Sequence, residues 1–250
     1  MIGKNTIKWV HSLEMKKNRK REQLFVAEGP KVVGDLLAHY RPRAVFATSE
    51  WEGRSSVPSY AEVETVSDDE LRRLSFLQHP QQVLAVFEMG EQGTPSLNAD
   101  RLTLVLDGVQ DPGNLGTIIR IADWFGIDNI ICSPETADAY NPKVVQATMG
   151  SLAHVHLHYI DLNTFIAQQS GNVPIFGTFL NGKDIYSTQL SQSGIIVMGN
   201  EGNGISEEVR THVTHPLLIP NFRQGDGAES LNVAVATAIT CSEFCRRLNK

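Results

Sequence analysis

The sequence predicts an α/β protein in which a larger domain with a mostly parallel sheet follows a smaller α/β domain. Short apolar strands alternate with amphipathic helices along the chain, as in parallel sheets covered by helices. Residues 102–106 (LTLVL) form a continuous apolar run, which is typical of a strand buried on both faces. Residues 89–101 lose this periodicity and collect glycine, proline, serine and asparagine. We therefore expect domains at 1–90 and 102–250, joined by a linker at 91–101.

The smaller domain is expected to contain three helices and two strands. Apolar residues at helical spacing and local capping residues predict the helices, and short runs rich in valine and phenylalanine predict the strands. Asn5 or Thr6 is the expected cap of the first helix. The predicted helices are 6–15, 29–38 and 68–74, and the predicted strands are 44–48 and 83–87.

The larger domain continues the alternation to its end. Its expected strands are apolar runs of four to six residues, and its helices begin at capping residues or prolines. The predicted strands are 102–106, 129–132, 154–157, 174–179, 194–198 and 215–219. The predicted helices are 115–124, 142–148, 206–210 and 232–248, with Asn114 as the expected cap of the first.

Composition excludes several classes of protein. No apolar run approaches the roughly 18–20 residues that span a bilayer, and the first residues lack the apolar core of a secretory signal. The cysteines Cys132, Cys241 and Cys245 are too few for a disulfide framework. We therefore expect a cytoplasmic protein without membrane contact.

Charge is distributed unevenly along the chain. The net charge is −6, but residues 1–21 alone carry a balance of +6, so the remainder sums to −12. A basic segment on an acidic body can steer an anionic partner to one place, although a solvated helix face is the alternative interpretation. The candidate RNA-binding residues are Lys16, Lys17, Lys20 and Arg21.

Three loops that follow apolar strands hold the residue types that chemistry requires. The first, at 106–120, contains Asn114 and Arg120, which alone could be a helix cap and a surface arginine. The second, at 195–206, is glycine-rich and contains Glu201. Its spacing GxxGxG differs from the dinucleotide fingerprint GxGxxG, and no Walker phosphate loop is present. These spacings argue against a nucleotide-dependent oxidoreductase.

The third loop, at 217–236, leads from a strand into a helix of small residues. Ser230 and Asn232 open this helix and could be plain caps. The run VAVATAIT permits close packing of backbones, at a subunit contact or at a tight internal crossing.

Together the three loops resemble the signature motifs of the SpoU/TrmH family of RNA ribose 2′-O-methyltransferases, in the knotted SPOUT superfamily. Asn114 and Arg120 match the first motif, the GNEGNG loop from Gly199 matches the second, and IP…SLNVAVA from Ile219 matches the third. The resemblance spans about 102–247. Residues 6–88, with FVAEGPKVVGDLL at 25–37, resemble the N-terminal substrate-binding module of the ribosomal-RNA branch. The segment 221–229, with Phe222 and Arg223, is longer and more polar than the family's usual link.

The resemblance implies a C-terminal domain tied in a trefoil knot, an S-adenosylmethionine cofactor and a homodimer packed through the knotted region. It implies methyl transfer to a ribose 2′-hydroxyl of RNA, most simply ribosomal RNA. Transfer RNA as the substrate, or a catalytically silent knotted RNA-binding protein, are the alternatives. The implied catalytic residues are Asn114, Arg120, Glu201, Ser230 and Asn232. The implied cofactor-binding residues are Thr178, Met198, Gly199, Asn200, Gly202, Ile219 and Leu231.

Other residues that could carry chemistry have simpler interpretations. His154, His156 and His158 would share one strand face, but no cysteine or carboxylate neighbours them at ligand spacing, so no metal site is expected. The i, i+4 cysteines Cys241 and Cys245 are expected in the core. Trp9, Phe25 and Trp51 are expected to be core residues rather than platforms for RNA bases.

Overall fold

A computed structural model describes the chain except residues 91–94, 96–99, 170, 224–227 and 249–250. Most of the expected linker at 91–101 therefore lies outside the described residues. The chain divides into two compact units, Met1–Glu91 with Asp138–Ala153, and Gln92–Ala137 with His154–Lys250. The segment Asp138–Ala153 thus groups with the N-terminal unit. The boundaries 1–90 and 102–250 stay a prediction about domains.

The N-terminal unit contains a four-stranded sheet of order β1-β4-β2-β3. The central strand β4 pairs antiparallel with β1 and β2, and the short β3 pairs parallel with β2 at the edge. The bounds are β1 (Leu24–Glu28), β2 (Pro42–Ala47), β3 (Val63–Thr65) and β4 (Val83–Glu88).

Helices pack against this sheet, and the hydrophobic core lies between the helices and the strands. Val10, Leu13, Leu71 and Leu74 belong to one buried cluster with side chains of β1 and β4, and α3 buries its apolar side chains separately. The helices are α1 (Lys4–Ser12), α2 (Lys16–Glu22), α3 (Pro30–Leu37), α4 (Asp68–Leu74) and α6 (Pro142–Thr148), with short 3-10 turns η1 (Glu52–Ser56) and η2 (Ser151–Ala153).

The C-terminal unit contains a six-stranded sheet of order β10-β8-β9-β5-β6-β7 in which every strand pairing is parallel. β5 and β9 lie at its centre with all but one of their residues fully buried, as expected for parallel strands covered on both faces. The bounds are β5 (Leu102–Asp107), β6 (Asn129–Cys132), β7 (His156–Tyr159), β8 (Ile175–Asp184), β9 (Gly194–Gly199) and β10 (His215–Leu218).

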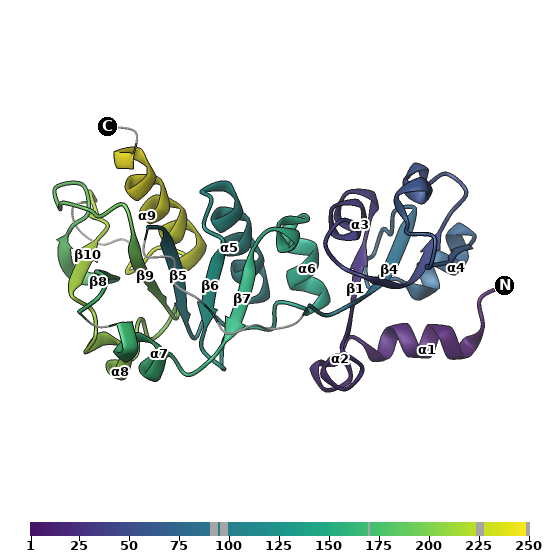
Figure 1. Ribbon diagram of the computed structural model, residues 1–250, viewed down its shortest axis with the longest axis horizontal. Coiled ribbons are helices and arrows are strands. Elements are labelled where there is room, and N and C mark those ends of the chain that lie inside the picture. The colour runs from purple at the N-terminus through teal and green to yellow at the C-terminus, as the bar shows by residue number, and fades with distance from the viewer. Residues whose placement is uncertain (91–94, 96–99, 170, 224–227, 249–250) are drawn as a thin grey trace. The chain divides into compact units, whose positions relative to one another are not determined.

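Different helices cover the two faces of this sheet. α7 (Leu162–Gln169) and α8 (Glu207–Arg210) pack on the face that carries Val105, Ile195 and Val197. α9 (Val233–Leu248) covers the opposite face, where Phe244 contacts Phe176, and it packs beside α5 (Pro112–Trp124), as Figure 1 shows. Successive strand residues point to opposite faces, so both faces need apolar side chains.

The predicted α/β class and the parallel sheet of the larger domain are confirmed. α4, α6 and β6 have the predicted bounds, and the other predicted elements apart from β8 differ by one to three residues at an end. β8 is the exception, because it continues five residues beyond the predicted end. Residues 224–227, which precede α9, are outside the described part, and the trefoil knot stays a prediction.

Two predicted helix caps are wrong. α1 begins after Gly3, without a side-chain cap, so neither Asn5 nor Thr6 caps it. Asp111 caps α5, because its carboxylate accepts the main-chain N–H of Asn114 and proline occupies the first helical turn. Asn114 therefore lies inside the helix, and its side chain is free for other partners.

The sequence prediction missed α2, α7, β1 and β3. β1 is buried along its whole length, so it shows no alternation, and β3 has only three residues. The sequence of α2, KKNRKRE, contains no apolar residue that could reveal a helical period. Arg19 stabilises this helix by tertiary contacts, because its guanidinium donates to Leu13 O, Glu14 O and Asp138 Oδ2.

Candidate active site

The first candidate loop connects β5 to α5 in the C-terminal unit. Asp107 ends the strand, and Gly108 follows with φ of +72°, a conformation that favours glycine. The cap formed by Asp111 sets the start of α5, so that Asn114 lies in the first helical turn with its side chain half-buried.

The second loop leaves the adjacent strand β9 and folds back on itself. Asn200 and Gly204 exchange two main-chain hydrogen bonds of 2.9 Å, and Asn200 Oδ1 accepts from the N–H groups of Gly202 and Asn203. The side chain of Asn200 also donates to Gly108 O at 2.7 Å. Asp107 and Gly199 are register partners, so both loops leave the carboxyl edge of the sheet side by side. This edge is where parallel α/β sheets bind ligands.

Hydrogen bonds connect the second and third loops through Asn114. Asn114 Nδ2 donates to Glu201 Oε1 at 2.6 Å, and Asn114 Oδ1 accepts from Asn232 Nδ2 at 2.9 Å. Asn232 Oδ1 accepts from the N–H groups of Ala234 and Val235 and thereby caps α9. Asn114 and Asn232 each use the amide N–H in one hydrogen bond and the amide oxygen in another. The hydrogen bonds therefore all run in one direction, from Asn232 through Asn114 to Glu201.

Arg120 and Ser230 are not drawn into this network. Arg120 is exposed on α5 and forms no hydrogen bond or ion pair with any residue that the structure describes. Ser230 is also exposed, and Asn232 rather than Ser230 caps α9. A charged guanidinium without a protein partner is available to an anionic ligand, because its fork of N–H donors fits phosphate oxygens.

The predicted cofactor residues occupy the same edge of the sheet. Thr178 on β8 contacts Met198 on β9, with 3.8 Å between the hydroxyl and the sulfur. Ile219 follows the end of β10, and Leu231 precedes α9 with 48% of its surface exposed. The main-chain groups of Ile219 and Leu231 form no hydrogen bond within the described residues, so they can serve a ligand.

Gly199 has no room for a side chain. A Cβ on Gly199 would lie 2.2 Å from the carbonyl carbon of Gly204 and 2.3 Å from the nitrogen of Ile205. The loop's own backbone therefore requires glycine there, before any cofactor approaches. A Cβ on Gly202 would meet Asn200 Oδ1 at 3.5 Å, which is ordinary contact.

Several supporting residues escaped the sequence prediction. Asp107 Oδ2 accepts the main-chain N–H of Ser206 at 2.7 Å, which holds the exit of the second loop against the first. Ser133 Oγ accepts from Gly108 N, and Thr136 donates to Leu106 O. The pair Asp111-Pro112, a capping residue before proline, was a local signal that could have located the start of α5.

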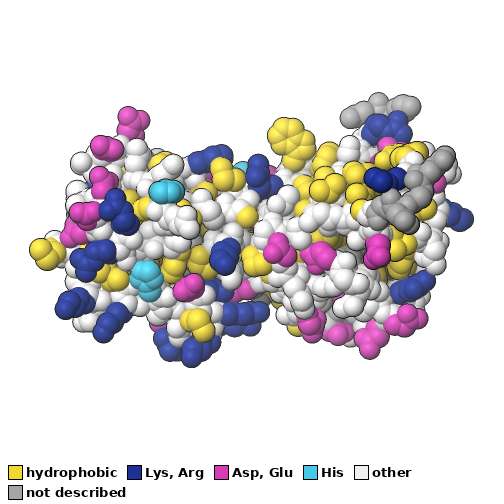
Figure 2. All heavy atoms as spheres, turned by 180° about the vertical axis from the view of Figure 1, so that it is seen from behind, with side chains coloured by type: hydrophobic (Ala, Val, Ile, Leu, Met, Phe, Trp, Pro, Cys, Tyr) yellow, Lys and Arg dark blue, Asp and Glu magenta, His cyan; other side chains and the backbone are white. Residues whose placement is uncertain are grey.

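The basic residues of the N-terminal unit lie on α2. Lys16, Lys17, Lys20 and Arg21 are all exposed, and their spacing places them on one face of the helix. Figure 2 shows Lys and Arg side chains gathered over this part of the unit. Arg19 is different, because its side chain is 1% exposed and its guanidinium pairs with Asp138 at 2.6 Å. Arg19 anchors the helix, and the other cations face solvent.

Of the three histidines expected on one strand face, His156 and His158 lie two residues apart on β7 and share a face, whereas His154 lies outside the strand. His154 precedes β7 and contacts Asp123, while His158 Nε2 lies 3.3 Å from Asn129 Oδ1. Among the described residues, no group of three or more His, Cys, Asp or Glu side chains could hold a metal ion.

The remaining sequence expectations concern the core. Phe25, Trp51 and Cys241 are buried as expected, whereas Trp9 and Cys245 are half-buried. Burial raises the pKa of Cys241 to about 12, so this thiol stays neutral. Of the described helices, none has the length and apolar character that crossing a membrane requires.

Known proteins share both parts of this sequence. Residues 101–242 match the pattern of the SpoU rRNA Methylase family, and residues 4–85 match the MRM3-like substrate binding domain. The chain is 33% identical over 230 residues to 23S rRNA (guanosine(2553)-2′-O)-methyltransferase RlmP of Bacillus subtilis, covering 91% of this chain and 90% of that protein.

Solved structures share the whole fold. A putative RNA methyltransferase of the TrmH family from Porphyromonas gingivalis has 43% identity and a TM-score of 0.89, with 99% of each chain covered. The SpoU methyltransferase AviRb from Streptomyces viridochromogenes, solved in complex with the cofactor AdoMet, has 26% identity and a TM-score of 0.85, covering 100% of this chain and 99% of that one.

The parallel sheet, the three joined loops and these matches define the class as an α/β enzyme of the SPOUT type. The chain belongs to the SpoU rRNA methylase family, and the resemblance read from its three motifs is confirmed.

Proposed function

We propose that the protein transfers a methyl group from S-adenosylmethionine to a ribose 2′-hydroxyl of ribosomal RNA. The observation that carries this proposal is the hydrogen-bonded chain from Glu201 through Asn114 to Asn232. It joins three sequence motifs that lie far apart in the chain, at the sheet edge where α/β folds bind ligands. A fold used only to bind RNA would not require this particular set of side chains.

The residues at this edge fit the cofactor. The unused main-chain groups of Ile219 and Leu231 can bind adenine and ribose, and the exposed Leu231 side chain offers an apolar surface for the base. Thr178, Met198, Gly199, Asn200 and Gly202 complete the proposed binding set. Bound S-adenosylmethionine supplies a methyl group activated by the positive charge on its sulfur.

Arg120 is the proposed contact to the reacting nucleotide. Its guanidinium donates hydrogen bonds and holds no acceptor, so it clamps the adjoining phosphate and stabilises negative charge that develops on the 2′-oxygen. Asn114, Glu201, Ser230 and Asn232 orient the ribose. Positioning of the hydroxyl for in-line attack accounts for a large part of the acceleration in such reactions.

Ribosomal RNA is the proposed substrate, and the N-terminal unit is its proposed docking module. The family match over residues 4–85 and the ribosomal substrates in the relatives' names support this choice over transfer RNA. Lys16, Lys17, Lys20 and Arg21 on α2 would contact phosphates. A cytoplasmic location follows from this substrate and remains part of the proposal.

We further propose a homodimer through the C-terminal unit. Trp124 on α5 is 84% exposed and Val235 on α9 is 49% exposed, whereas the other described apolar side chains of these two helices are buried or half-buried. Apolar groups left exposed on packed helices are typical of a covered surface. Light scattering at micromolar concentration should give twice the chain mass, and Trp124→Glu should give the monomer mass. A monomeric wild type would exclude the dimer.

The experiment that tests the function is a comparison of 2′-O-methyl groups in RNA from a deletion strain and its parent, mapped by mass spectrometry. We expect one ribosomal-RNA site to lose its methyl group and to regain it with the wild-type gene but not with the Arg120→Ala gene. Loss from transfer RNA instead would identify the alternative substrate. An unchanged methylation map would contradict the proposed enzyme.

A further inference from the structure

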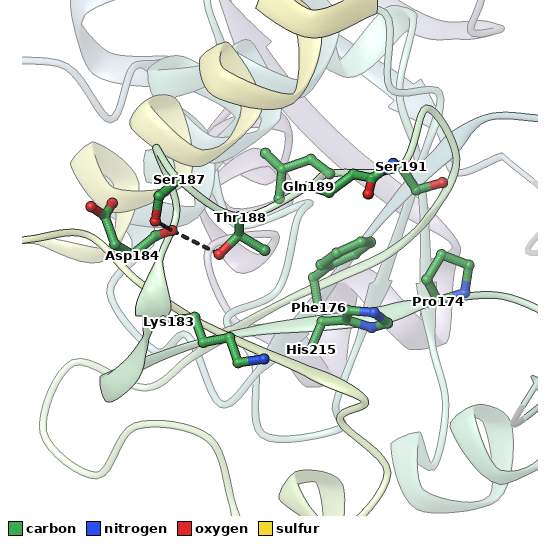
Figure 3. A pocket seen from close by; sticks show the side chains of 10 residues that line it. Pro174, Phe176, Lys183, Asp184, Ser187, Thr188, Gln189, Ser191 and His215 are labelled. Atoms are coloured by element: carbon green, nitrogen blue, oxygen red, sulfur yellow. Dashed lines mark hydrogen bonds between the residues drawn. The ribbon is translucent and has the colours of Figure 1, made fainter.

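A cavity of about 890 Å³ lies in the C-terminal unit between β8, β10 and the return segment, residues 185–193, which connects β8 to β9 (Figure 3). No predicted catalytic or cofactor residue lines it. Its lining includes Phe176, Lys183, Thr188, Gln189, Ser191 and His215.

The described lining of the cavity shares no residue with the candidate active site. Phe176 and His215 are register partners near the amino ends of β8 and β10. The active-site loops instead follow the carboxyl ends of β5 and β9. Lys183 and Asp184, which also line the cavity, are the last two residues of β8 and pair with Leu217 and Leu218 after a shift in register, so the cavity extends along β8 from Phe176 to these residues.

The return segment forms a fixed wall. Arg247 on α9 donates to the carbonyl oxygens of Ile185, Tyr186 and Thr188, and Glu243 in turn accepts from Arg247. The side chain of Glu243 is only 6% exposed. A guanidinium that uses several of its donors on one segment restricts the motion of that segment. The fold therefore fixes this side of the cavity.

The charge of the cavity favours an anion. Lys183 is exposed and forms no ion pair with any described residue, and its ammonium group points toward His215 in Figure 3. The single carboxylate of the lining, Asp184, points away from Lys183 and accepts the N–H of Tyr186 at 2.8 Å. Ser191 and Gln189 add neutral hydrogen-bond donors.

His215 provides an aromatic surface beside this cation. Its ring lies 4.9 Å from the ring of Phe176 with a 39° tilt, and Thr214 Oγ1 lies 2.7 Å from its Nδ1. These contacts orient the imidazole while leaving the residue exposed. Histidine and other aromatic side chains stack on nucleobases in RNA-binding proteins.

We propose that this cavity binds a nucleotide, with its phosphate on Lys183 and its base against His215. The volume lies within the range of about 300–1,000 Å³ that is usual for small-ligand sites. The nucleotide is either a free mononucleotide or one residue of an RNA strand, since both offer the same phosphate and base. The site is independent of the methyl-transfer reaction, so it stands or falls separately from the proposed function.

The test compares uridine 5′-monophosphate with uridine by saturation-transfer NMR, with S-adenosylhomocysteine present to fill the cofactor site. We expect Lys183→Ala to weaken the monophosphate about 10-fold and to leave uridine unchanged, because a charge-assisted contact is lost. His215→Ala should weaken both ligands. Lys143→Ala removes an exposed lysine of α6 outside the cavity and is the matched control.

A short oligouridylate distinguishes the two sources of the nucleotide. If the oligonucleotide binds more tightly than the monophosphate and loses affinity in Lys183→Ala, the cavity takes a residue of RNA. If only the monophosphate responds to Lys183→Ala, the ligand is a free nucleotide. No binding of the monophosphate to the wild type at about 10 mM, or equal binding to both variants and the wild type, would overturn the proposal.

Discussion

Asn114 donates its side-chain amide to Glu201 at 2.6 Å, across 87 residues of sequence. The same amide accepts from Asn232, which caps the last helix. One side chain thus joins the ends of two neighbouring strands to the start of α9. This arrangement is possible because Asp111, and not Asn114, caps α5.

Asn114→Ala should lower both stability and cofactor affinity. It removes two side-chain hydrogen bonds that each contribute about 0.5–1.5 kcal/mol, and it leaves the Asp111 cap intact. Asn114→Asp should lower stability and cofactor affinity further, because a carboxylate cannot donate a hydrogen bond to Glu201 and repels its negative charge. Urea denaturation and calorimetric titration with S-adenosylmethionine measure the two effects. Thr117→Ala, one turn further along α5, is the control. Equal unfolding free energies and equal cofactor affinities in all three variants would exclude a special role for Asn114.

Arg120→Ala should separate chemistry from binding. The exposed guanidinium has no partner among the described residues, so its removal should not affect folding or cofactor affinity. Methyl transfer should fall by a factor of about 100 to 1,000, since a donor to developing negative charge is lost. Arg120→Lys should recover only part of the rate, because lysine offers a point charge and no planar fork. Single-turnover rates with labelled cofactor test this, and a normal rate in Arg120→Ala would remove it from the reaction.

Gly199→Ala should unfold or distort the second loop, whereas Gly202→Ala should be tolerated. The added Cβ would meet the backbone of Gly204 at 2.2 Å in the first variant but only Asn200 Oδ1 at 3.5 Å in the second. We expect a clear drop in thermal midpoint for Gly199→Ala even without cofactor, measured by circular dichroism. Equal midpoints for the two variants would show that the loop can rearrange without cost.

Replacing Lys16, Lys17, Lys20 and Arg21 by alanine should weaken RNA binding and leave turnover at saturating RNA unchanged. The slope of log K against log salt should decrease by about one unit for each lost phosphate contact. Lys31→Ala with Arg72→Ala is the matched control, because these exposed cations already pair with Asp35 and Asp69. A slope that changes equally in both variants would indicate a general charge effect and no specific docking face.

Glu243→Gln should reduce the sensitivity of the fold to acid. Hydrogen bonds from Arg246 and then Arg247 lower the pKa of Glu243 from 4.5 to about 2. The folded pKa is lower than the unfolded one, so this stabilisation is complete above pH 4.5 and is lost as pH falls toward 2. The free energy of unfolding of the wild type should therefore fall more steeply over this range than that of the variant. An equal dependence of the unfolding free energy on pH in the wild type and in Glu243→Gln would contradict the lowered pKa of Glu243.

The sequence alone determined the elements whose signals are local. The buried run at β5, the capped helix α4 and the small-residue helix α9 follow from apolar patterning and capping chemistry, which act within a few residues. The resemblance of the three motifs to those of the SpoU/TrmH family likewise placed Asn114, Glu201 and Asn232 in one predicted site.

Only the tertiary structure decided how these residues meet and which neighbours support them. The charged helix α2 has no apolar period and depends on the contact of Arg19 with Asp138, 119 residues away. The need for glycine at position 199 arises from the backbone of Gly204 and Ile205, which folds back over it. Such requirements come from the packing of atoms brought together by the whole fold, and no local pattern in the sequence records them.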